Sequence, residues 1–396
     1  MKLGPLFLFA ATCAAGDFTE RGFLEIQGDF YPRAALNDSG HEVGEASFRY
    51  ETFYKPVPFL QFSAGIDANT DSHRQVERRL HLSLWDRERL RPALALREAS
   101  ITLSAKKLTL QIGKQFIRWG KADVLNPTDR FAPRDYLNVV ENDFLAVGAA
   151  RLTYGSTSDT LDLVWEPRFT PSRMPLLNQR WTVLPAGISV QELFPDYPGG
   201  SQFGARWNHV ARLAEFSISA FDGFNHLPSI RGTAEGFQRF YPRIRAYGVD
   251  MAVPLKWITF RGETEYFRAH NSQADEYWLY VAQLERQSGE WFFTAGYTGQ
   301  AIVRQRSPAD FNPERGLARA FVAHAGYTID TNRSVNFEAI VRQNGRGEWV
   351  KAEYSQAFGQ HWRATITLGL IRGEPDDFLG QYWRNSYGIL WFRYSF

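Results

Sequence analysis

Apolar and polar residues alternate along this chain from Phe23 onward, in stretches of about ten residues. A clear case is Leu60, Phe62, Ala64 and Ile66, which have polar or small residues between them. A period of two places successive side chains on opposite faces of a β-strand. No helical period is sustained along the sequence. The pattern therefore predicts an all-β protein whose strands each have one apolar and one polar face.

Eighteen such stretches follow one another in the sequence. They begin near Gly22, Gly44, Pro58, Ala93, Lys107, Phe144, Asp159, Ser201, Arg212, Arg243, Trp257, Glu276, Gly289, Ala318, Ser334, Gly347, His361 and Asn385. Single-chain bacterial membrane barrels have even strand numbers. Lipid offers no hydrogen bonds to an open sheet edge, so a sheet with an apolar outer face must close. We expect a transmembrane antiparallel up-and-down β-barrel of eighteen strands, with sixteen as the alternative.

The links between these stretches alternate between short and mostly long ones, as they do in a chain that runs up and down through a membrane. Short links fall at residues 56–58, 105–107, 155–158, 209–211, 254–256, 287–289, 330–332 and 358–360. The longest links are residues 69–92, 118–143, 168–200, 225–242, 300–317 and 372–384. We expect the short links on the periplasmic side and the long ones outside, with the barrel spanning residues 16–396.

Both ends of the chain favour export to the bacterial outer membrane. Residues 1–15 join a basic Lys2, an apolar run and small residues, which predicts a signal peptide that also contains the only cysteine, Cys13. At the other end, Phe396 follows an alternating strand and resembles the C-terminal signal that outer-membrane assembly machinery recognises. Aromatic residues at the stretch ends match the girdles of a membrane barrel. The expected surroundings are outer-membrane lipid, and the expected partner is the assembly machinery.

Charge and histidine spacing exclude several classes of function. Lys and Arg number 45 against 43 Asp and Glu, so nothing indicates a nucleic-acid partner. The eight histidines are scattered without metal-ligand spacing, and no Ser, His and acid set stands in a catalytic context. We expect neither an enzyme nor a cofactor nor a metal.

If the apolar face of each strand meets lipid, the charged face lines a water-filled lumen. The expected lumen wall includes Arg49, Glu51, Glu98, Lys114, Arg261, Glu263, Glu265, Glu338 and Arg342. Lys114 is out of phase, because Leu108, Leu110 and Ile112 before it face lipid. We predict a bulge near Gly113 that turns Lys114 inward. Many of these charges are expected to pair across strands.

The link that begins at Arg118 is dense in charge, proline and turn residues (RWGKADVLNPTDRFAPRDY). Our hypothesis is that this link, residues 118–143, folds into the lumen and narrows it, so that opposed charges select solutes. The candidate constriction consists of Arg118, Lys121, Asp123, Asp129, Arg130, Arg134 and Asp135. The alternative is an outer loop whose charges pair with one another.

This motif and the preceding Gly113-Lys114-Gln115 resemble the signature of an uncharacterised proteobacterial outer-membrane porin-like family, distantly related to alginate-export barrels. The resemblance is most specific from Leu96 to Tyr136, about a tenth of the chain. It implies an outer-membrane barrel and, by analogy with the alginate-export relatives, solute passage. No motif in this sequence matches the ligand residues of the alginate porins, so the resemblance does not identify alginate as the solute.

Together these features predict a porin-like channel for passive passage of small hydrophilic solutes. Two other classes stay open: a barrel that sheathes a periplasmic partner such as a multihaem cytochrome, and a surface receptor that binds through residues 69–92 and 168–200. Without a CxxCH motif here, any haem would come from another chain. The sequence names no solute, direction of transport, pore radius or oligomeric state, and does not say whether the lumen is open or filled.

Overall fold

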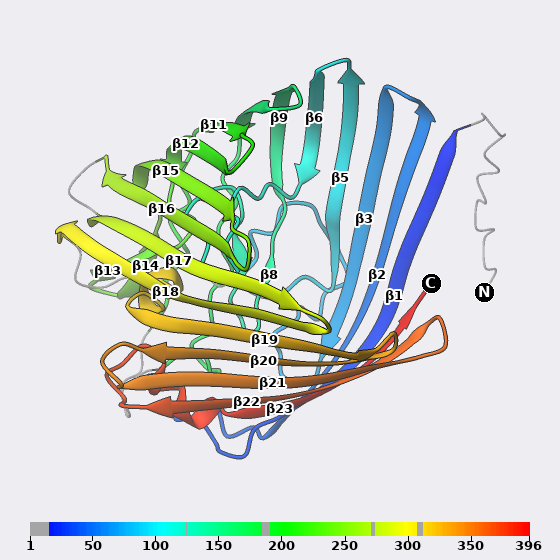
Figure 1. The fold of residues 1–396 in the computed structure, drawn as a ribbon. Helices are drawn as coiled ribbons and strands as arrows, with labels where there is room; N and C mark the ends of the chain where they lie inside the picture. Colours follow the sequence, from blue (N-terminus) through cyan, green and yellow to red (C-terminus); the bar gives the residue numbers. More distant parts are fainter. Residues whose placement is uncertain (1–15, 124, 184–190, 271–273, 307–311) are drawn as a thin grey trace, which may run out of the picture.

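The computed structural model describes residues 16–123, 125–183, 191–270, 274–306 and 312–396. The expected signal peptide, residues 1–15, lies outside the described residues. Eighteen strands form a closed antiparallel barrel, which confirms the predicted fold (Figure 1). They are β1 (Asp17–Phe30), β2 (Glu42–Val57), β3 (Leu60–Asp71), β5 (Leu94–Ala105), β6 (Leu108–Gln115), β9 (Val147–Gly155), β10 (Asp159–Glu166), β11 (Gln202–Val210), β12 (Glu215–Phe224), β15 (Arg243–Pro254), β16 (Thr259–Ala269), β17 (Glu276–Ser288), β18 (Trp291–Arg304), β19 (Ala320–Asp330), β20 (Arg333–Arg342), β21 (Gly347–Phe358), β22 (Trp362–Gly373) and β23 (Tyr387–Ser395).

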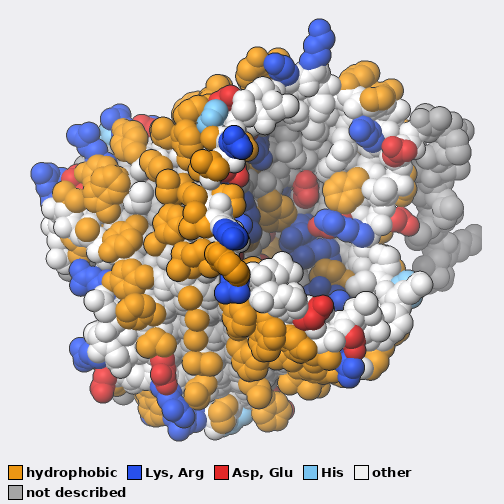
Figure 2. Space-filling view, viewed as in Figure 1, with side chains coloured by type: hydrophobic (Ala, Val, Ile, Leu, Met, Phe, Trp, Pro, Cys, Tyr) orange, Lys and Arg blue, Asp and Glu red, His pale blue; other side chains and the backbone are white. Residues whose placement is uncertain are grey.

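Each wall strand pairs with its neighbour along the chain, and β23 pairs with β1 to close the ring. The outer surface is apolar: Leu24 is 53% exposed, Ile26 67% and Leu368 61%, and Figure 2 shows hydrophobic side chains spread over the wall. Alternate positions carry the polar and charged side chains inward, as the period of two predicts. A closed sheet with this outer face is the architecture of a transmembrane β-barrel.

The first wall strand, β1, meets the last residue, Phe396, at the end of the barrel with the short turns. The Gly22 amide donates to the Phe396 carbonyl oxygen at 2.9 Å, and the Phe396 amide donates back to the Gly22 carbonyl oxygen at 3.0 Å. The long links lie at the opposite end, which corresponds to the outer side in bacterial barrels. We call these the short-turn end and the long-loop end.

The long links contain the remaining elements. These are β4 (Leu82–Ser83), β7 (Arg134–Asp135), β8 (Asp143–Phe144), the hairpin β13 (Ser229–Thr233) and β14 (Gly236–Phe240), α1 (Pro313–Gly316) and the 3-10 helix η1 (Gly380–Asn385). Within the described ranges, no helix has the length and apolar character that a membrane crossing requires.

The shortest wall strands are β6 and β10, with eight residues each, and β9 between them has nine, whereas β1 has 14 and β2 has 16. Beyond the end of β6, the exposed edge of β5 pairs instead with β4 in parallel, Leu82 opposite Leu94. The chain leaves the wall at Gln115 and re-enters it at Val147. The wall is short here because this connection turns into the barrel.

Lys114 avoids lipid by a different route from the one predicted. The pairing of β6 shows no register shift on either side, so the predicted bulge near Gly113 is absent from this strand. The shift lies in β5, where Arg97 has no partner in β3. Gly113 adopts φ +127°, and the buried Lys114 ammonium donates to an Asp86 carboxylate oxygen and the Leu96 carbonyl oxygen, both at 2.5 Å. The loop before β5 thus supplies the counter-ion that the burial of a lysine requires.

Candidate channel constriction

Residues 116–123 and 125–146, which we call the inner segment, run inside the barrel wall (Figure 1). The segment packs against inward-facing side chains of the wall. Its Trp119 and Phe131 rings meet edge to face at 5.4 Å, and Phe131 meets Phe221 of β12 at 5.2 Å. These rings are 1–3% exposed and share a cluster with Phe267 of β16 and Leu279 of β17. Apolar burial of this kind is the main favourable term in packing, so the segment is held against this half of the wall.

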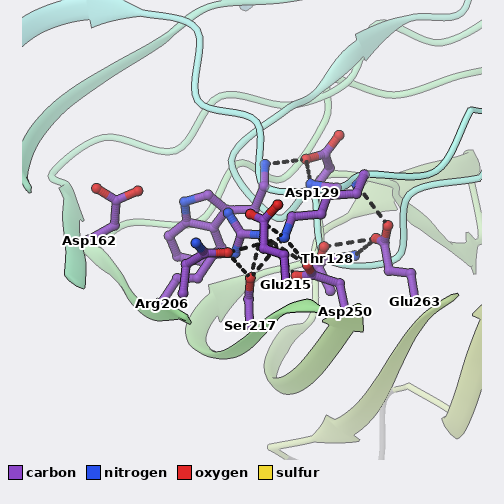
Figure 3. A network of polar contacts seen from close by, with 12 residues as sticks. Thr128, Asp129, Asp162, Arg206, Glu215, Ser217, Asp250 and Glu263 are labelled. Atoms are coloured by element: carbon purple, nitrogen blue, oxygen red, sulfur yellow. Dashed lines mark hydrogen bonds and ion pairs between the residues drawn. The ribbon is translucent and has the colours of Figure 1, made fainter. Parts of the chain in front are cut away.

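Lys121 fixes the inner segment to three strands. Two of its partners, Glu215 and Asp250, are labelled in Figure 3. Its ammonium donates to Glu215 at 2.8 Å, and it forms an ion pair with Asp250 at 3.0 Å. It also donates to the side-chain amide oxygen of Asn208 at 3.1 Å. Arg206 of β11 forms a second ion pair with Asp250 at 2.9 Å. The ammonium group of Lys121 therefore attaches the inner segment to the wall.

The carboxylate of Glu263 on β16 accepts hydrogen bonds from backbone amides of the same segment. One carboxylate oxygen accepts from the amide and the hydroxyl of Thr128, both at 2.8 Å, and the other accepts from the Lys121 amide at 3.0 Å. Within the segment, Asp129 accepts from the Trp119 and Gly120 amides at 2.6 and 2.7 Å. These bonds satisfy backbone donors that would otherwise be buried without partners.

Arg130 lies between the wall and an outer loop. Its guanidinium forms ion pairs with Glu265 of β16 at 3.0 Å and with Glu314 of α1 at 3.2 Å, and its carbon lies 4.8 Å from the centroid of the Phe267 ring. The Arg130 side chain is 1% exposed. Burial alone would raise the pKa of Glu314, but Arg130 and the adjacent His226 outweigh it and hold that pKa at about 2.

A second buried cluster, the loop clasp, joins the inner segment to two outer loops. Asp135 of β7 pairs with Arg173 at 2.6 Å and with Arg91 at 3.1 Å. Arg173 also reaches Asp86, the partner of Lys114, at 3.5 Å. Burial would raise the pKa of Asp135, but Arg173 and Arg91 lower it to about 2. Links from three parts of the sequence are therefore tied together by charge.

The other candidate constriction residues are also engaged. Arg118 pairs with Asp129 at 3.5 Å and lies 4.0 Å from the Phe144 ring centroid, with 46% of its side chain exposed. Arg134 stacks on the same ring at 4.1 Å. Asp123 accepts a hydrogen bond from the Thr294 hydroxyl of β18 at 3.2 Å. The structure brings all the candidates into the inner segment, but Asp129, Arg130 and Asp135 are buried anchors that do not face open water.

Eight of the nine expected lumen-wall residues bond to loops or form ion pairs with other wall residues, and Arg261 does both, because it also donates to the Lys121 carbonyl oxygen at 3.4 Å. Glu263, Glu265, Lys114 and Arg342 hold loops, the last through Asp377 at 3.1 Å. Arg49, Glu51, Arg261 and Glu338 pair with other wall residues: Asp67 at 2.7 Å, Arg21 at 2.6 Å, Glu285 at 2.7 Å and Lys351 at 3.1 Å. Glu98 stands opposite Gly65 in the neighbouring strand.

A cavity of about 320 Å³ lies between the inner segment and the wall of β1, β2, β3, β5 and β23. Figure 2 shows the hollow inside the wall of β3 and β5, with Lys and Arg side chains gathered in it. Its charged lining consists of Glu25, Asp29, Glu45, Arg49, Asp67, Asp86, Arg91, Arg97, Asp135, Glu141, Asp143, Arg173, Arg180 and Arg393. Both signs are present, so water and polar solutes match this surface better than apolar ones do.

Sequence reasoning missed several arginines of this cavity. Arg97 precedes the predicted Glu98, and the irregular pairing of β5 brings both residues to the inner side. Arg91, Arg173 and Arg180 lie in long links that have no period to place them. A local phase change in β5 could have suggested Arg97, but only the folded loops locate the other three.

No family model matches this chain, and no curated protein matches its sequence. Solved structures do resemble it. A BenF-like porin from Pseudomonas fluorescens Pf-5 aligns with a TM-score of 0.57 at 8% identity over 96% of this chain and 98% of that one. Pseudomonas aeruginosa OpdQ (0.56, 10% identity) and Acinetobacter baumannii OccAB4 (0.55, 11% identity) each cover 95% of this chain and 98% of their own. At these identities the likeness is one of fold: the chain has the fold of outer-membrane porins.

Proposed function

We propose that this protein is an outer-membrane channel through which small hydrophilic solutes pass passively. The observation that carries the proposal is the combination of an apolar outer face with a charged cavity inside the closed wall. A barrel with a polar interior holds water, and water-filled barrels of this strand number conduct small solutes. The fold shared with solved porins supports the same reading.

The solute path in this proposal runs along the cavity, between the inner segment and β1–β3. Arg49 and Arg97 on the wall face the cavity together with Asp67, which pairs with both at 2.7 and 3.3 Å. The buried candidates of the inner segment, such as Arg130, then act as anchors that set the width of the path. Water-exposed wall charges, in contrast, set which ions and polar groups are favoured.

The two other functions have less support from the interior. A sheath for a partner protein needs a wide lumen, whereas the inner segment and its apolar cluster occupy part of the interior of this barrel. A receptor role rests only on the long loops, whose described charges are largely tied to one another. Kinship with alginate-export barrels stays part of the proposal and rests on the motif within residues 96–136.

Assembly in this proposal uses the C-terminal strand. Phe396 is 44% exposed on the outer surface, where its ring lies 6.4 Å from the rings of Phe48 and Tyr50. An exposed terminal ring is accessible to the assembly machinery before the barrel closes. No described feature of the short-turn end singles out a periplasmic partner protein.

Purified protein in planar bilayers and in liposomes tests the channel. We expect discrete conductance steps and swelling with small sugars, amino acids and organic acids, with rates that fall as solute size increases. Complete absence of both conductance and swelling, from protein shown to be folded, would refute the channel and favour a receptor. A matched pair, Arg97→Gln on the cavity and Arg286→Gln outside it, tests the path: only the former should change ion preference.

A further inference from the structure

Arginines gather on the outer surface of the barrel, where lipid-facing positions are otherwise apolar. Arg243 and Arg245 of β15 and Arg268 of β16 occupy the long-loop end of these strands; we call them the rim arginines. They point outward, because they alternate with inward-facing Ile244, 3% exposed, and Phe267, 1% exposed. An outward charge is tolerated only near the membrane interface, so the rim arginines mark the level of the outer headgroups.

The charge of this cluster is incompletely balanced within the protein. Asp222 of β12 accepts from Arg243 at 2.6 Å and from Arg245 at 3.0 Å. Arg268 stands directly opposite Arg245 in the strand pairing and has no ion-pair partner among the described residues. Like charges in directly opposed positions are destabilising. By contrast, Arg372 elsewhere on the rim stands opposite Glu348. Among the described residues, the three rim arginines therefore share a single carboxylate, that of Asp222.

A groove of about 620 Å³ lies on the outer face beside the rim arginines. Its floor is formed by Ala205 and Ala220, which are directly opposed on β11 and β12, and its sides by Leu163 and Tyr247, their neighbours in register. Arg245 and Asp222 line the same groove at its long-loop end. Small residues between large ones leave space for an apolar chain that runs along the strands from a charged head.

Aromatic side chains near the rim arginines indicate the same depth in the membrane. Tyr266 and Trp278 contact each other on the outer face with ring centroids 5.0 Å apart and ring planes tilted by 30°, and Tyr266 lies two residues before Arg268 on the same face. Such rings sit at the depth of lipid headgroups. The arginines just beyond them are therefore at the depth of headgroup phosphates, and guanidinium groups bind phosphate bidentately.

We propose that the rim arginines and the adjacent groove form a binding site for a phosphorylated, acylated lipid of the outer leaflet. Its phosphate bridges Arg245 and Arg268, and one acyl chain lies over Ala205 and Ala220. The lipid phosphate supplies a second anion beside Asp222, and the acyl chain fills the groove, which stabilises this part of the barrel wall. This site is separate from the inner cavity and does not depend on conductance.

The test is native mass spectrometry of the full barrel in detergent, titrated with bisphosphorylated lipid A, dephosphorylated lipid A, phosphatidylcholine or inorganic phosphate. Each basic residue at an anionic lipid surface changes affinity by about fivefold, so the double substitution Arg245→Gln/Arg268→Gln should weaken lipid A binding about thirtyfold. Arg286→Gln is the matched control, because Arg286 faces outward on β17 at the short-turn end, near Trp257. It should leave affinity unchanged.

The groove has its own test. Ala220→Trp fills the floor without changing charge and should weaken lipid A binding at least tenfold, whereas Ala282→Trp, at an outward position of β17, should not. Heat-modifiable migration verifies that each variant is folded. Equal lipid A binding by the wild type and the double variant would overturn the proposal, as would equal binding of the dephosphorylated lipid. Inorganic phosphate that binds as tightly as lipid A would assign the site to a free anion, and an oligomer that Ala220→Trp converts to a monomer would assign the groove to a second copy.

Discussion

Replacing Arg130 with Met should release the inner segment. The Arg130 side chain is 1% exposed, and its guanidinium lies between Glu265 at 3.0 Å and Glu314 at 3.2 Å. Its loss leaves the buried Glu265 carboxylate without its cation and leaves Glu314 with only His226, 3.7 Å away. Removing one partner of a buried ion pair costs about 3–5 kcal/mol, whereas exposed pairs contribute about 0–1 kcal/mol. Methionine keeps the aliphatic stem over Phe267, so the packing changes little. The ratio of docked to released segment should fall by about a hundredfold to a few thousandfold.

Single-channel recording measures this release directly. We expect the Arg130→Met channel to show a larger mean conductance and frequent transitions between levels, because the segment no longer stays against the wall. Arg118→Met is the control, since that side chain is 46% exposed and pairs only at 3.5 Å; it should behave like the wild type. Neutralising the carboxylates as well, in a triple variant with Glu265→Gln and Glu314→Gln, should restore most of the wild-type behaviour. If Arg130→Met and Arg118→Met gave identical steady conductances, the anchoring role of Arg130 would be wrong.

Three other regions of the barrel give measurable expectations. Asp135→Asn removes the carboxylate of the loop clasp, so its arginine partners repel and trypsin should cleave the loops of the micellar protein faster; unchanged cleavage would contradict the clasp. Because the pKa of Asp135 is lowered from 3.8 to about 2 on folding, its stabilisation is complete above about pH 4 and lost as the pH falls through about 2, so the loops should open only in strong acid. Gly113→Ala places a Cβ atom 2.1 Å from a backbone carbonyl oxygen at φ +127° and should lower the folded yield seen by heat-modifiable migration, whereas Gly155→Ala, with no atom nearer than 3.6 Å, should not. Leu368→Lys puts an ammonium in lipid and should cost about 2–4 kcal/mol if it lies near the midplane, and an unaltered urea midpoint in vesicles would show that this face is not lipid-facing.

The wall of the barrel could be predicted from the sequence because lipid and water impose a period of two that no loop can imitate over many strands. The alternation did not fix every strand boundary. The stretch predicted from Phe144 is divided in the structure: Phe144 belongs to β8, and the wall strand β9 begins at Val147. Nearly every residue from 144 to 150 is apolar or small, so the pattern there cannot separate a lipid-facing strand from a buried segment.

The ion-pair partners of the candidate site residues could not be predicted from the sequence. Asp135 meets Arg173, and Arg130 meets Glu314, across separations of 38 and 184 residues along the chain. A charge-rich link identifies residues that need partners, but the partners depend on which long loops fold into the same barrel. The placement of Arg97 depends in addition on an irregular register in β5, which a strict alternation cannot reveal.

In the proposed channel, different residues determine the width of the solute path and its selectivity among solutes. The inner segment is held by buried ion pairs and an apolar cluster on one side, and neither tolerates small shifts, because an unpaired buried charge and a cavity are both costly. We therefore expect the segment to act as a rigid boundary of the proposed solute path. Across the cavity, Arg49 and Arg97 are 24% and 20% exposed and share Asp67, so their substitution leaves no buried charge unpaired. Changes at these wall positions should thus alter which solutes are favoured without altering the width, whereas changes at the anchors should do the opposite.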